Sequence, residues 1–460
     1  MTAPAAAPAT IASGAPIPAA VPKVGPFRAA KLPAVDERTL ASGLRVLAVR
    51  KPGVPLVQAR LALPAPRPRA TLADRARQLV LAETLLSGTH QRDSIEVAEA
   101  LQRMGATLSV AVDSEDLRLQ GSTLAPSLSD YLGLIGELLS EPAFPKGEVE
   151  IERARKAQEV LLQRSEPEVI ARAALRRRLW GEHPYALGLP DPAEVGAVTA
   201  AELRRSFRSR VTARDGLLIL VGDLRPAKAL DAAEAALGSW TGAGDVSRLP
   251  ALPPVGPGPV VLVDRPGAAQ SNVRIGGPAL TRRDDGLPAL QLANMVFGGY
   301  FSSRLVENIR ERKGYTYSPR SWIDHRLLGS VLLIQADVGT GVTGPALLEI
   351  RYELGRMATL AVSGDELDAA RRYLIGTTAL STQTQSGLAD YLLTLGLAGL
   401  GLDYLRSLPK RLEKVTVDDV RDAAAEYLAP ARLPTVIVGD AAAVRRALET
   451  LDAVEDGAQP

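Results

Sequence analysis

The sequence has no cysteine and only three histidines in 460 residues: His90, His183 and His325. The lack of cysteine excludes disulfides, thiolate nucleophiles and cysteine-based metal sites. No two of the histidines lie within one helical turn, so a pair of histidine ligands on one helix face is excluded as well. None stands in a recognisable nucleophile-elbow context for a Ser-His-Asp triad, and no glycine-rich phosphate-binding pattern follows a strand. These absences exclude much of conventional hydrolase and nucleotide-binding chemistry.

Aromatic residues make up 4% of the sequence, whereas 46% of the residues are hydrophobic. The core must therefore be built from Leu, Val, Ile and Ala, which suits layers of helices packed on sheets. Lys plus Arg number 54 against 52 Asp plus Glu, and this balance of +2 is spread along the chain, so no nucleic-acid partner is expected. The most basic stretch, Arg172 to Arg178, has apolar periodicity and is interpreted as a solvated helix face.

Long hydrophobic runs are also missing. The stretch from Leu392 to Leu400 is too short and too rich in glycine for a bilayer, which needs about 20 apolar residues, so no membrane span is expected. Residues 1–35 are rich in Ala and Pro and are predicted to form a disordered N-terminal segment. No secretory signal peptide is evident, which favours the cytoplasm for the sequence as written, and the periplasm or another extracytoplasmic compartment if it is a processed form.

What the sequence does contain is a duplication. Val198-Thr199 opens a helical segment that leads to an apolar strand and then to Gly222-Asp223. Val415-Thr416 opens another, which leads to a strand and then to Gly439-Asp440. Both pairs of landmarks are 217 residues apart, since 416 − 199 and 440 − 223 give the same offset. A repeated order of landmarks at one offset is typical of two homologous units.

The start of each half repeats too, because apolar strands run into Pro52-Gly53 and Pro266-Gly267, 214 residues apart (266 − 52). Each half then has two strands, a helix pair, a strand pair, several helices, a last strand and a closing helix. This order predicts an α+β fold of two homologous α/β units, each an antiparallel-type sheet packed with helices. The predicted organisation is a first unit at 36–239, a Pro-rich linker at 240–259, a second unit at 260–452 and a tail at 453–460.

One phrase in the second half carries a family resemblance. The run from Asn294 to Ser318 reads NMVFGGYFSSRLVENIRERKGYTYS. It is similar to the signature of the C-terminal half of short-chain bacterial members of the insulinase (pitrilysin) family of zinc peptidases, and the resemblance covers about residues 36 to 452. In the first half, Leu86-Ser87-Gly88-Thr89 resembles the stretch that follows the zinc motif of the family.

The resemblance implies where a metal site would be. The family binds zinc with H-x-x-E-H on a helix, two histidines as ligands and a glutamate that activates water. That motif falls on residues 79–83, where Leu79, Ala82 and Glu83 stand at its three functional positions, and none keeps the required residue. Glu159 stands at the position of the distal ligand, with a charged helix face as the other interpretation. The sequence therefore predicts no metal or cofactor in this chain.

The resemblance also implies a substrate-binding pair. Family members hold the substrate with an Arg and a Tyr of the second unit, which correspond to Arg310, at the end of a predicted helix, and Tyr317, on a predicted following strand. A guanidinium and a phenol can stabilise the negative charge that forms on a peptide carbonyl oxygen. Tyr315, on the same predicted strand face, is the rival for this role. Gly298-Gly299 is predicted to form a close-approach turn, near the substrate path in the family.

Two functions follow from these observations. The first is the non-zinc, substrate-binding subunit of a heterodimeric metallopeptidase. A homologous chain with H-x-x-E-H would supply the zinc, and Arg310 and Tyr317 of this chain would complete the site. The two halves of this chain would form part of a chamber. Its substrate would be an unfolded peptide, held by strand addition to a sheet edge. The alternative is a non-catalytic scaffold or binding member of the same fold. Interpreted without the family, Arg310 is a solvated helix-end charge and Tyr317 a half-buried aromatic.

Overall fold

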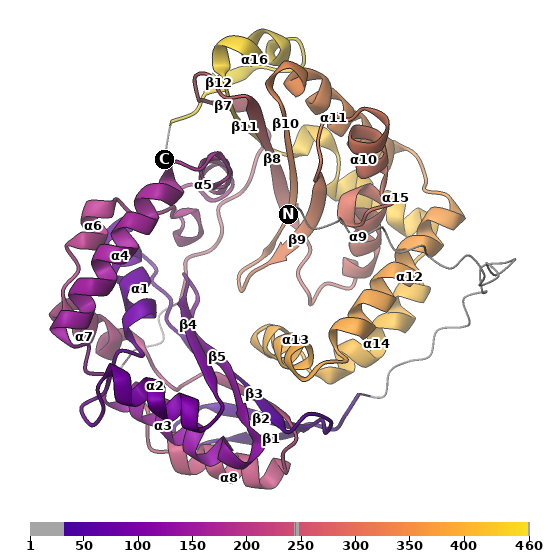
Figure 1. The fold of residues 1–460 in the computed structure, drawn as a ribbon. Coiled ribbons are helices and arrows are strands. Elements are labelled where there is room, and N and C mark those ends of the chain that lie inside the picture. Colours follow the sequence, from indigo (N-terminus) through magenta and orange to yellow (C-terminus); the bar gives the residue numbers. More distant parts are fainter. Residues whose placement is uncertain (1–31, 243, 245–247, 459–460) are drawn as a thin grey trace, which may run out of the picture. The chain divides into compact units, whose positions relative to one another are not determined.

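The computed structural model of the chain describes residues 32–242, 244 and 248–458. These residues form two six-stranded sheets and the helices that pack on them (Figure 1). The predicted α+β class and the predicted duplication are therefore confirmed.

The first half begins with three strands, because the short strand Asp36–Thr39 precedes the two that were predicted. In the described part of this half the strands are β1 (Asp36–Thr39), β2 (Arg45–Arg50), β3 (Leu56–Pro64), β4 (Thr107–Val112), β5 (Asp116–Leu124) and β6 (Leu217–Gly222). The helices are α1 (Leu72–Thr84), α2 (Ser94–Arg103), α3 (Leu128–Ser140), α4 (Lys146–Arg164), α5 (Pro167–Trp180), α6 (Pro192–Gly196), α7 (Ala200–Arg210) and α8 (Pro226–Leu237), with short 3-10 turns η1 (Ala125–Ser127) and η2 (Pro184–Ala186).

The second half repeats this order, but the helical region between its first and second strand pairs is more irregular, because it contains two π-helical segments. Its described strands are β7 (Val260–Asp264), β8 (Gln270–Ala279), β9 (Arg320–His325), β10 (Ser330–Gly339), β11 (Thr435–Gly439) and β12 (Val454–Asp456). Its helices are α9 (Leu287–Asn294), α10 (Arg304–Val306), α11 (Thr343–Thr359), α12 (Gly364–Ser381), α13 (Gln385–Leu397), α14 (Leu402–Glu413), α15 (Val417–Tyr427) and α16 (Ala441–Glu449), with π-helical η3 (Met295–Gly299) and η4 (Glu307–Arg312) and 3-10 turns η5 (Thr340–Val342) and η6 (Pro430–Arg432).

The two sheets have the same topology. Their shared strand orders are β2-β6-β3-β5-β4 and β7-β11-β8-β10-β9. Most neighbours are antiparallel, as predicted, but β2 pairs with β6 and β7 pairs with β11 in parallel, so the sheets are mixed. The sixth strand differs: β1 lies antiparallel to β2, whereas β12 comes from the C-terminal end and lies parallel to β7. The interpretation of 453–460 as a tail is therefore wrong for Val454–Asp456.

The landmark glycines have a physical role in this repeated topology. Gly222 ends β6 and Gly439 ends β11, and a Cβ at these positions would lie 2.1 Å from the Leu56 carbonyl oxygen and 2.5 Å from Ser271 Oγ, respectively. Gly53 and Gly267 have φ of 145° and 73°, in the range that side chains other than glycine rarely adopt. The same backbone demands at matching places explain why these dipeptides recur in both halves.

One face of each sheet is covered by a helix from the opposite half of the chain. Helix α5 packs on β8 and β11, and α13 packs on β6 and β3 (Figure 1). Ile170 and Ala171 of α5 share a cluster with Val263 and Val438. On the other side, apolar residues of α13 pack with those of β6: Leu388, Ala389, Leu392, Leu217, Ile219 and Val221. Because each half contributes one helix to the sheet of the other, these contacts hold the two halves together. They were not predicted from the sequence.

A buried cation marks the contact of α13 with the first sheet. Arg60 on β3 has 7% of its surface exposed, and its Nε donates to Asp390 Oδ1 at 2.6 Å while its Nη2 donates to Ser386 Oγ at 2.7 Å. Both acceptors lie on α13. A buried guanidinium needs such partners, so the pair fixes α13 on this sheet as well as satisfying Arg60.

The linker and the N-terminal segment were predicted to be irregular. Residues 1–31, 243, 245–247 and 459–460 lie outside the described residues. Within the described part, Leu32 and Val35 pack against the α13 cluster, so the disordered segment does not extend to residue 35. Leu249 is buried beside α5. Among the described residues, no single helix has the length and apolar character of a membrane span, although the bent pair α13 and α14, at 93°, passes that test together.

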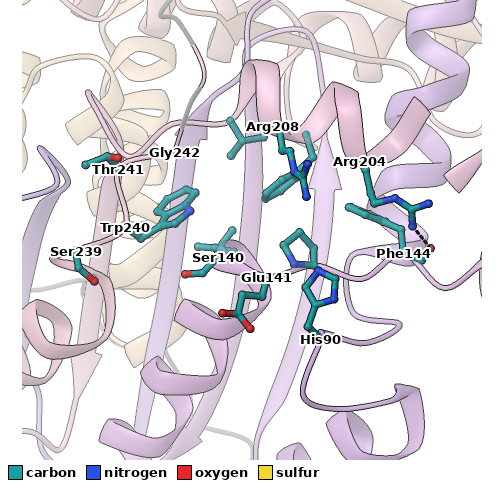
Figure 2. Close-up of a pocket in the computed structure, with 14 residues that line it drawn as sticks. His90, Ser140, Glu141, Phe144, Arg204, Arg208, Ser239, Trp240, Thr241 and Gly242 are labelled. Carbon is teal, nitrogen blue, oxygen red and sulfur yellow. Dashed lines mark hydrogen bonds between the residues drawn. The ribbon is translucent and has the colours of Figure 1, made fainter. Parts of the chain in front are cut away.

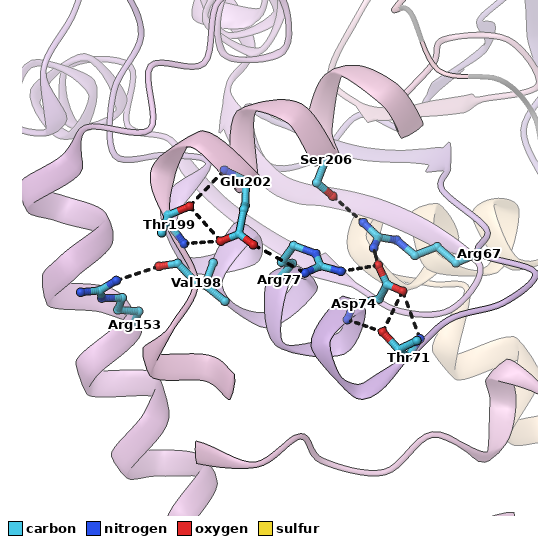
Figure 3. Close-up of polar contacts among 9 residues, drawn as sticks. All are labelled: Arg67, Thr71, Asp74, Arg77, Arg153, Val198, Thr199, Glu202 and Ser206. Carbon is cyan, nitrogen blue, oxygen red and sulfur yellow. Dashed lines mark hydrogen bonds and ion pairs between the residues drawn. The ribbon is translucent and has the colours of Figure 1, made fainter. Parts of the chain in front are cut away.

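A polar network fixes helix α1, which carries residues 79–83 (Figure 3). Thr71 and Asp74 form a capping box at its start, and Arg67 binds both Asp74 and Ser206 of α7. Arg77 Nη2 lies 2.8 Å from Asp74 Oδ1 and its Nη1 3.9 Å from Glu202, which belongs to the capping box of α7. The network therefore ties the N-termini of α1 and α7 to each other.

Candidate functional site

The positions that correspond to the zinc motif lie near the end of α1. Leu79, Ala82 and Glu83 are partly buried, whereas Val80 and Leu81, between them, face the core. The spacing of 79 and 83 puts both side chains on one helix face. The face that would carry two histidine ligands is thus present, with an apolar and an acidic side chain in their place.

The ammonium group of Lys156 lies between the carboxylates of Glu83 and Glu159. Lys156 Nζ on α4 lies 2.5 Å from Glu83 Oε1 and 2.8 Å from Glu159 Oε2. Arg155 also reaches both carboxylates, with Nη2 at 2.6 Å from Glu83 Oε2 and Nη1 at 3.6 Å from Glu159 Oε2. Two cations therefore converge on the two carboxylates that the family resemblance predicted to stand at the positions of the second and the distal zinc ligands.

These residues do not fit zinc. A zinc site needs three or four deprotonated N, S or O ligands, and no group of three or more His, Cys, Asp or Glu side chains among the described residues is arranged to hold a metal. Burial alone would lower the pKa of Lys156, but its hydrogen bonds to Glu159 and Glu83 outweigh burial and raise that pKa. Lys156 is therefore charged at neutral pH and would repel a divalent cation at this place.

The signature phrase of the second half forms an irregular helical segment. Gly298-Gly299, predicted to be a turn, lies in π-helical η3 at the end of α9. The close approach is nevertheless present, because a Cβ on Gly298 would lie 2.8 Å from Ser321 Oγ. Ser321 Oγ donates to the buried Asn294 Oδ1 at 2.6 Å, which ties α9 to β9. The two glycines thus allow this helix to pack closely on the strand.

Arg310 and Tyr317 lie together. Arg310 is in η4, near its end, and its guanidinium carbon is 4.7 Å from the centroid of the Tyr317 ring. The same carbon is 4.7 Å from the ring of Phe301. Arg310 Nε pairs with Glu311 Oε1 at 3.1 Å. Neither Nη group forms a hydrogen bond with another described residue, so both are available for an acceptor.

The placement of Tyr317 on a strand is wrong. Strand β9 begins at Arg320, and Tyr317 lies in the preceding bend with 81% of its surface exposed. Gly314 has φ of 64°, and Pro319 has no N–H for a sheet ladder, so the chain turns before the strand can begin. Tyr315, the rival residue, is half-buried and packs against the core of the second half. Its backbone N–H donates to the Ile309 carbonyl at 2.9 Å.

Contacts to α11 hold η4 in place. Asn308 Nδ2 donates to Glu349 Oε2 at 3.0 Å and to Glu353 Oε1 at 2.8 Å. Lys313 Nζ lies 3.0 Å from Glu349 Oε1. Arg310, between Asn308 and Lys313 in the sequence, therefore projects from a helical turn that is anchored on both sides.

Two cavities in the described part of the chain lie elsewhere. One of about 370 Å³ in the first half is lined by residues that include His90, Arg208 and Trp240 (Figure 2). A larger one of about 970 Å³ is lined by residues of both halves, among them His325, whose pKa burial lowers to about 4. Neither of these two cavities is lined by Arg310, Tyr317, Glu83 or Glu159.

Comparison with known proteins identifies the family of the chain. The family model described as insulinase (peptidase family M16) matches residues 80–193, and the model described as the peptidase M16 inactive domain matches residues 197–374. The chain belongs to the insulinase family. An uncharacterised zinc protease of Streptomyces coelicolor is 24% identical over 76% of this chain and 77% of its own length. A non-peptidase homologue of Helicobacter pylori is 22% identical over 75% and 79%.

Solved structures share the insulinase-family fold. The crystal structure of a peptidase M16 inactive domain from Pseudomonas fluorescens superposes with a TM-score of 0.80 at 21% identity, and covers 88% of this chain and 98% of its own. A protease from Helicobacter pylori superposes with a TM-score of 0.79 at 17% identity, over 88% of this chain and 100% of its own. This chain is thus an insulinase-family member, and Lys156 pairs in it with Glu83 and Glu159.

Sequence reasoning missed two residues at these sites. Lys156 precedes Glu159 by three positions, the spacing of ion pairs on one helix face, and this was the available signal. Phe301 lies inside the signature phrase, but an exposed position could not be inferred for it from the sequence.

Proposed function

We propose that this chain is the non-zinc, substrate-binding subunit of a heterodimeric metallopeptidase. A homologous chain with H-x-x-E-H supplies the zinc and the glutamate, and Arg310 and Tyr317 of this chain act on the same substrate. The observation that carries the proposal is the pairing of Arg310 with Tyr317 at 4.7 Å on an exposed surface. The chain has only three histidines, no two of them within one helical turn, so the zinc for cleavage would have to come from a second protein.

The chemistry of the pair suits a peptide bond under attack. When the carbonyl carbon becomes tetrahedral, its oxygen gains negative charge, and fixed donors aimed at that oxygen stabilise it. Arg310 offers two Nη groups without partners among the described residues, and the Tyr317 hydroxyl can donate from beside them. The stacked ring restricts the guanidinium, so less conformational entropy is lost when substrate binds.

The position of β9 supports an extended peptide as the substrate. This strand stands at the end of the strand order of its sheet, and it begins three residues after Tyr317. The free side of an edge strand can pair with the backbone of an added strand. A peptide that adds to β9 would be directed past Tyr317 and Arg310, which favours unfolded segments over folded proteins.

Reconstitution tests the proposal. The isolated chain should contain no zinc after purification and should cleave no unfolded protein such as reduced, carboxymethylated lactalbumin. After mixing with an H-x-x-E-H homologue from the same organism, the two chains should co-elute on size exclusion and cleave that protein. Co-elution without any effect of this chain on cleavage would support a scaffold role instead. Failure of the two chains to associate, or full activity of the homologue alone, would refute the proposed heterodimer.

A further inference from the structure

Phe301 is an unusual residue in this molecule. The sequence has five phenylalanines, and of those that the structure describes Phe144, Phe207 and Phe297 have 0%, 4% and 0% of their surface exposed. Phe301 has 61% exposed. A single exposed aromatic residue is common, but exposed aromatic residues that lie together indicate a binding surface, and Phe301 and the 81% exposed Tyr317 contact the same guanidinium.

The backbone around Phe301 is fixed on both sides. The preceding residue, Tyr300, stacks on Tyr373 of α12 with 5.1 Å between ring centroids. Three residues after Phe301, Arg304 donates twice to Glu366 of α12, from Nε at 2.7 Å and from Nη2 at 2.9 Å. The exposed ring is therefore held by two anchors and is not the end of a free loop.

Phe301 lies beside the proposed substrate-binding pair. The Arg310 guanidinium carbon is 4.7 Å from the Phe301 centroid and 4.7 Å from that of Tyr317, so one cation contacts both rings. The rest of the Phe301 ring remains open to solvent. A peptide whose carbonyl group accepts from Arg310 would therefore place a nearby side chain against this ring.

We propose that Phe301 is a substrate-binding residue that selects for an apolar peptide side chain next to the carbonyl group bound by Arg310. This inference rests on the proposed function, because it needs the peptide to bind at Arg310. It adds a preference that Arg310 and Tyr317 cannot supply, since a guanidinium and a phenol hydroxyl recognise the peptide backbone, which is the same in every sequence. An aliphatic or aromatic side chain would bury part of the open ring and lose water from both surfaces.

Fluorescence anisotropy with the full chain tests this inference. The probes are two fluorescein-labelled, 12-residue Gly/Ser peptides that differ only at a central position, which is leucine in one and serine in the other. The wild-type chain should bind the leucine peptide about five- to tenfold more tightly, the size expected for one apolar interface contact. Phe301→Ala should bring the two dissociation constants together, and Phe301→Tyr should restore most of the difference. Arg310→Ala should weaken binding of both peptides alike.

Tyr352→Ala is the matched control, because Tyr352 is another exposed aromatic, 56% exposed, whose ring contacts an arginine other than Arg310. It should leave the preference for leucine unchanged, and circular dichroism should show that all variants fold. An unchanged preference in Phe301→Ala, with weaker binding of both peptides to Arg310→Ala, would overturn the role of Phe301 alone. If the wild-type chain binds neither peptide, or if Arg310→Ala binds both as tightly as the wild type does, the role of Phe301 and peptide binding at Arg310 would both be overturned.

Discussion

Replacement of Lys156 by methionine removes the cation between Glu83 and Glu159 and keeps the length of the side chain. The Lys156 side chain has 11% of its surface exposed, and its two carboxylate partners, Glu83 and Glu159, have 30% and 38%. Breaking a fully buried ion pair costs about 3–5 kcal/mol, and an exposed pair is worth about 0.2–1 kcal/mol. Arg155 stays beside both carboxylates after the change. We therefore expect the free energy of unfolding to fall by about 1–2 kcal/mol.

Urea denaturation followed by circular dichroism at pH 7 measures this difference. Lys146→Met is the control, because Lys146 lies on the same helix, is 87% exposed and is 3.9 Å from Glu150, so its loss should change stability by less than about 0.5 kcal/mol. Equal stability of the wild type and Lys156→Met would refute the idea that the ion pairs of Lys156 with Glu83 and Glu159 stabilise the fold.

The same lysine should also oppose metal binding when ligands are restored. A Leu79→His, Glu83→His variant has two histidines on one face of α1 with Glu159 nearby. Isothermal titration with zinc should show binding at least about tenfold tighter when Lys156→Met is added, because the ammonium no longer repels the ion. Equal zinc affinity with and without Lys156 would contradict the electrostatic account of this site.

Two further outcomes follow from the polar contacts of the fold. Burial would raise the pKa of Asp74, but the hydrogen bond from Arg77 and the charge of Arg67 lower it to about 2 from 3.8. The stability that this carboxylate contributes is therefore present above pH 3.8 and is lost as the pH falls toward 2. In urea denaturation, Asp74→Asn should lower the free energy of unfolding by about 2 kcal/mol at pH 7 and by progressively less between pH 4 and 2. Asp390→Ala removes a partner of the buried Arg60 and should speed amide hydrogen exchange in α13, whereas Asp403→Ala, at a 92% exposed position in α14, should not.

Local patterns predicted most elements because local chemistry forms them. Helices α1 and α7 begin at capping boxes that are visible in the sequence as Thr71 with Asp74 and Thr199 with Glu202. The duplication was visible because the same glycine positions are required at the same turns of both halves. Strand β12 was missed because a three-residue strand carries almost no periodicity.

The partners of buried helices were not predictable. The apolar faces of α5 and α13 indicate burial, but periodicity does not show which sheet covers them, and in each case it is the sheet of the other half. Tyr315 and Tyr317 are two positions apart, as residues on one face of a strand are, yet one packs on the core and the other is exposed beside Arg310, because the chain bends before Pro319. Such outcomes depend on the packing of segments distant in sequence.

The central claim is that Arg310 acts on a substrate cleaved at the zinc of another chain. The most direct test is kcat/KM of the reconstituted pair with Arg310→Ala in this chain, beside Arg312→Ala, which removes a 69% exposed arginine from the same helical turn. The account predicts a fall of about 100-fold or more for Arg310→Ala, the size expected for loss of a charge-stabilising donor, and little change for Arg312→Ala. Equal kcat/KM for the two variants and the wild type, with the two chains still associated, would contradict it.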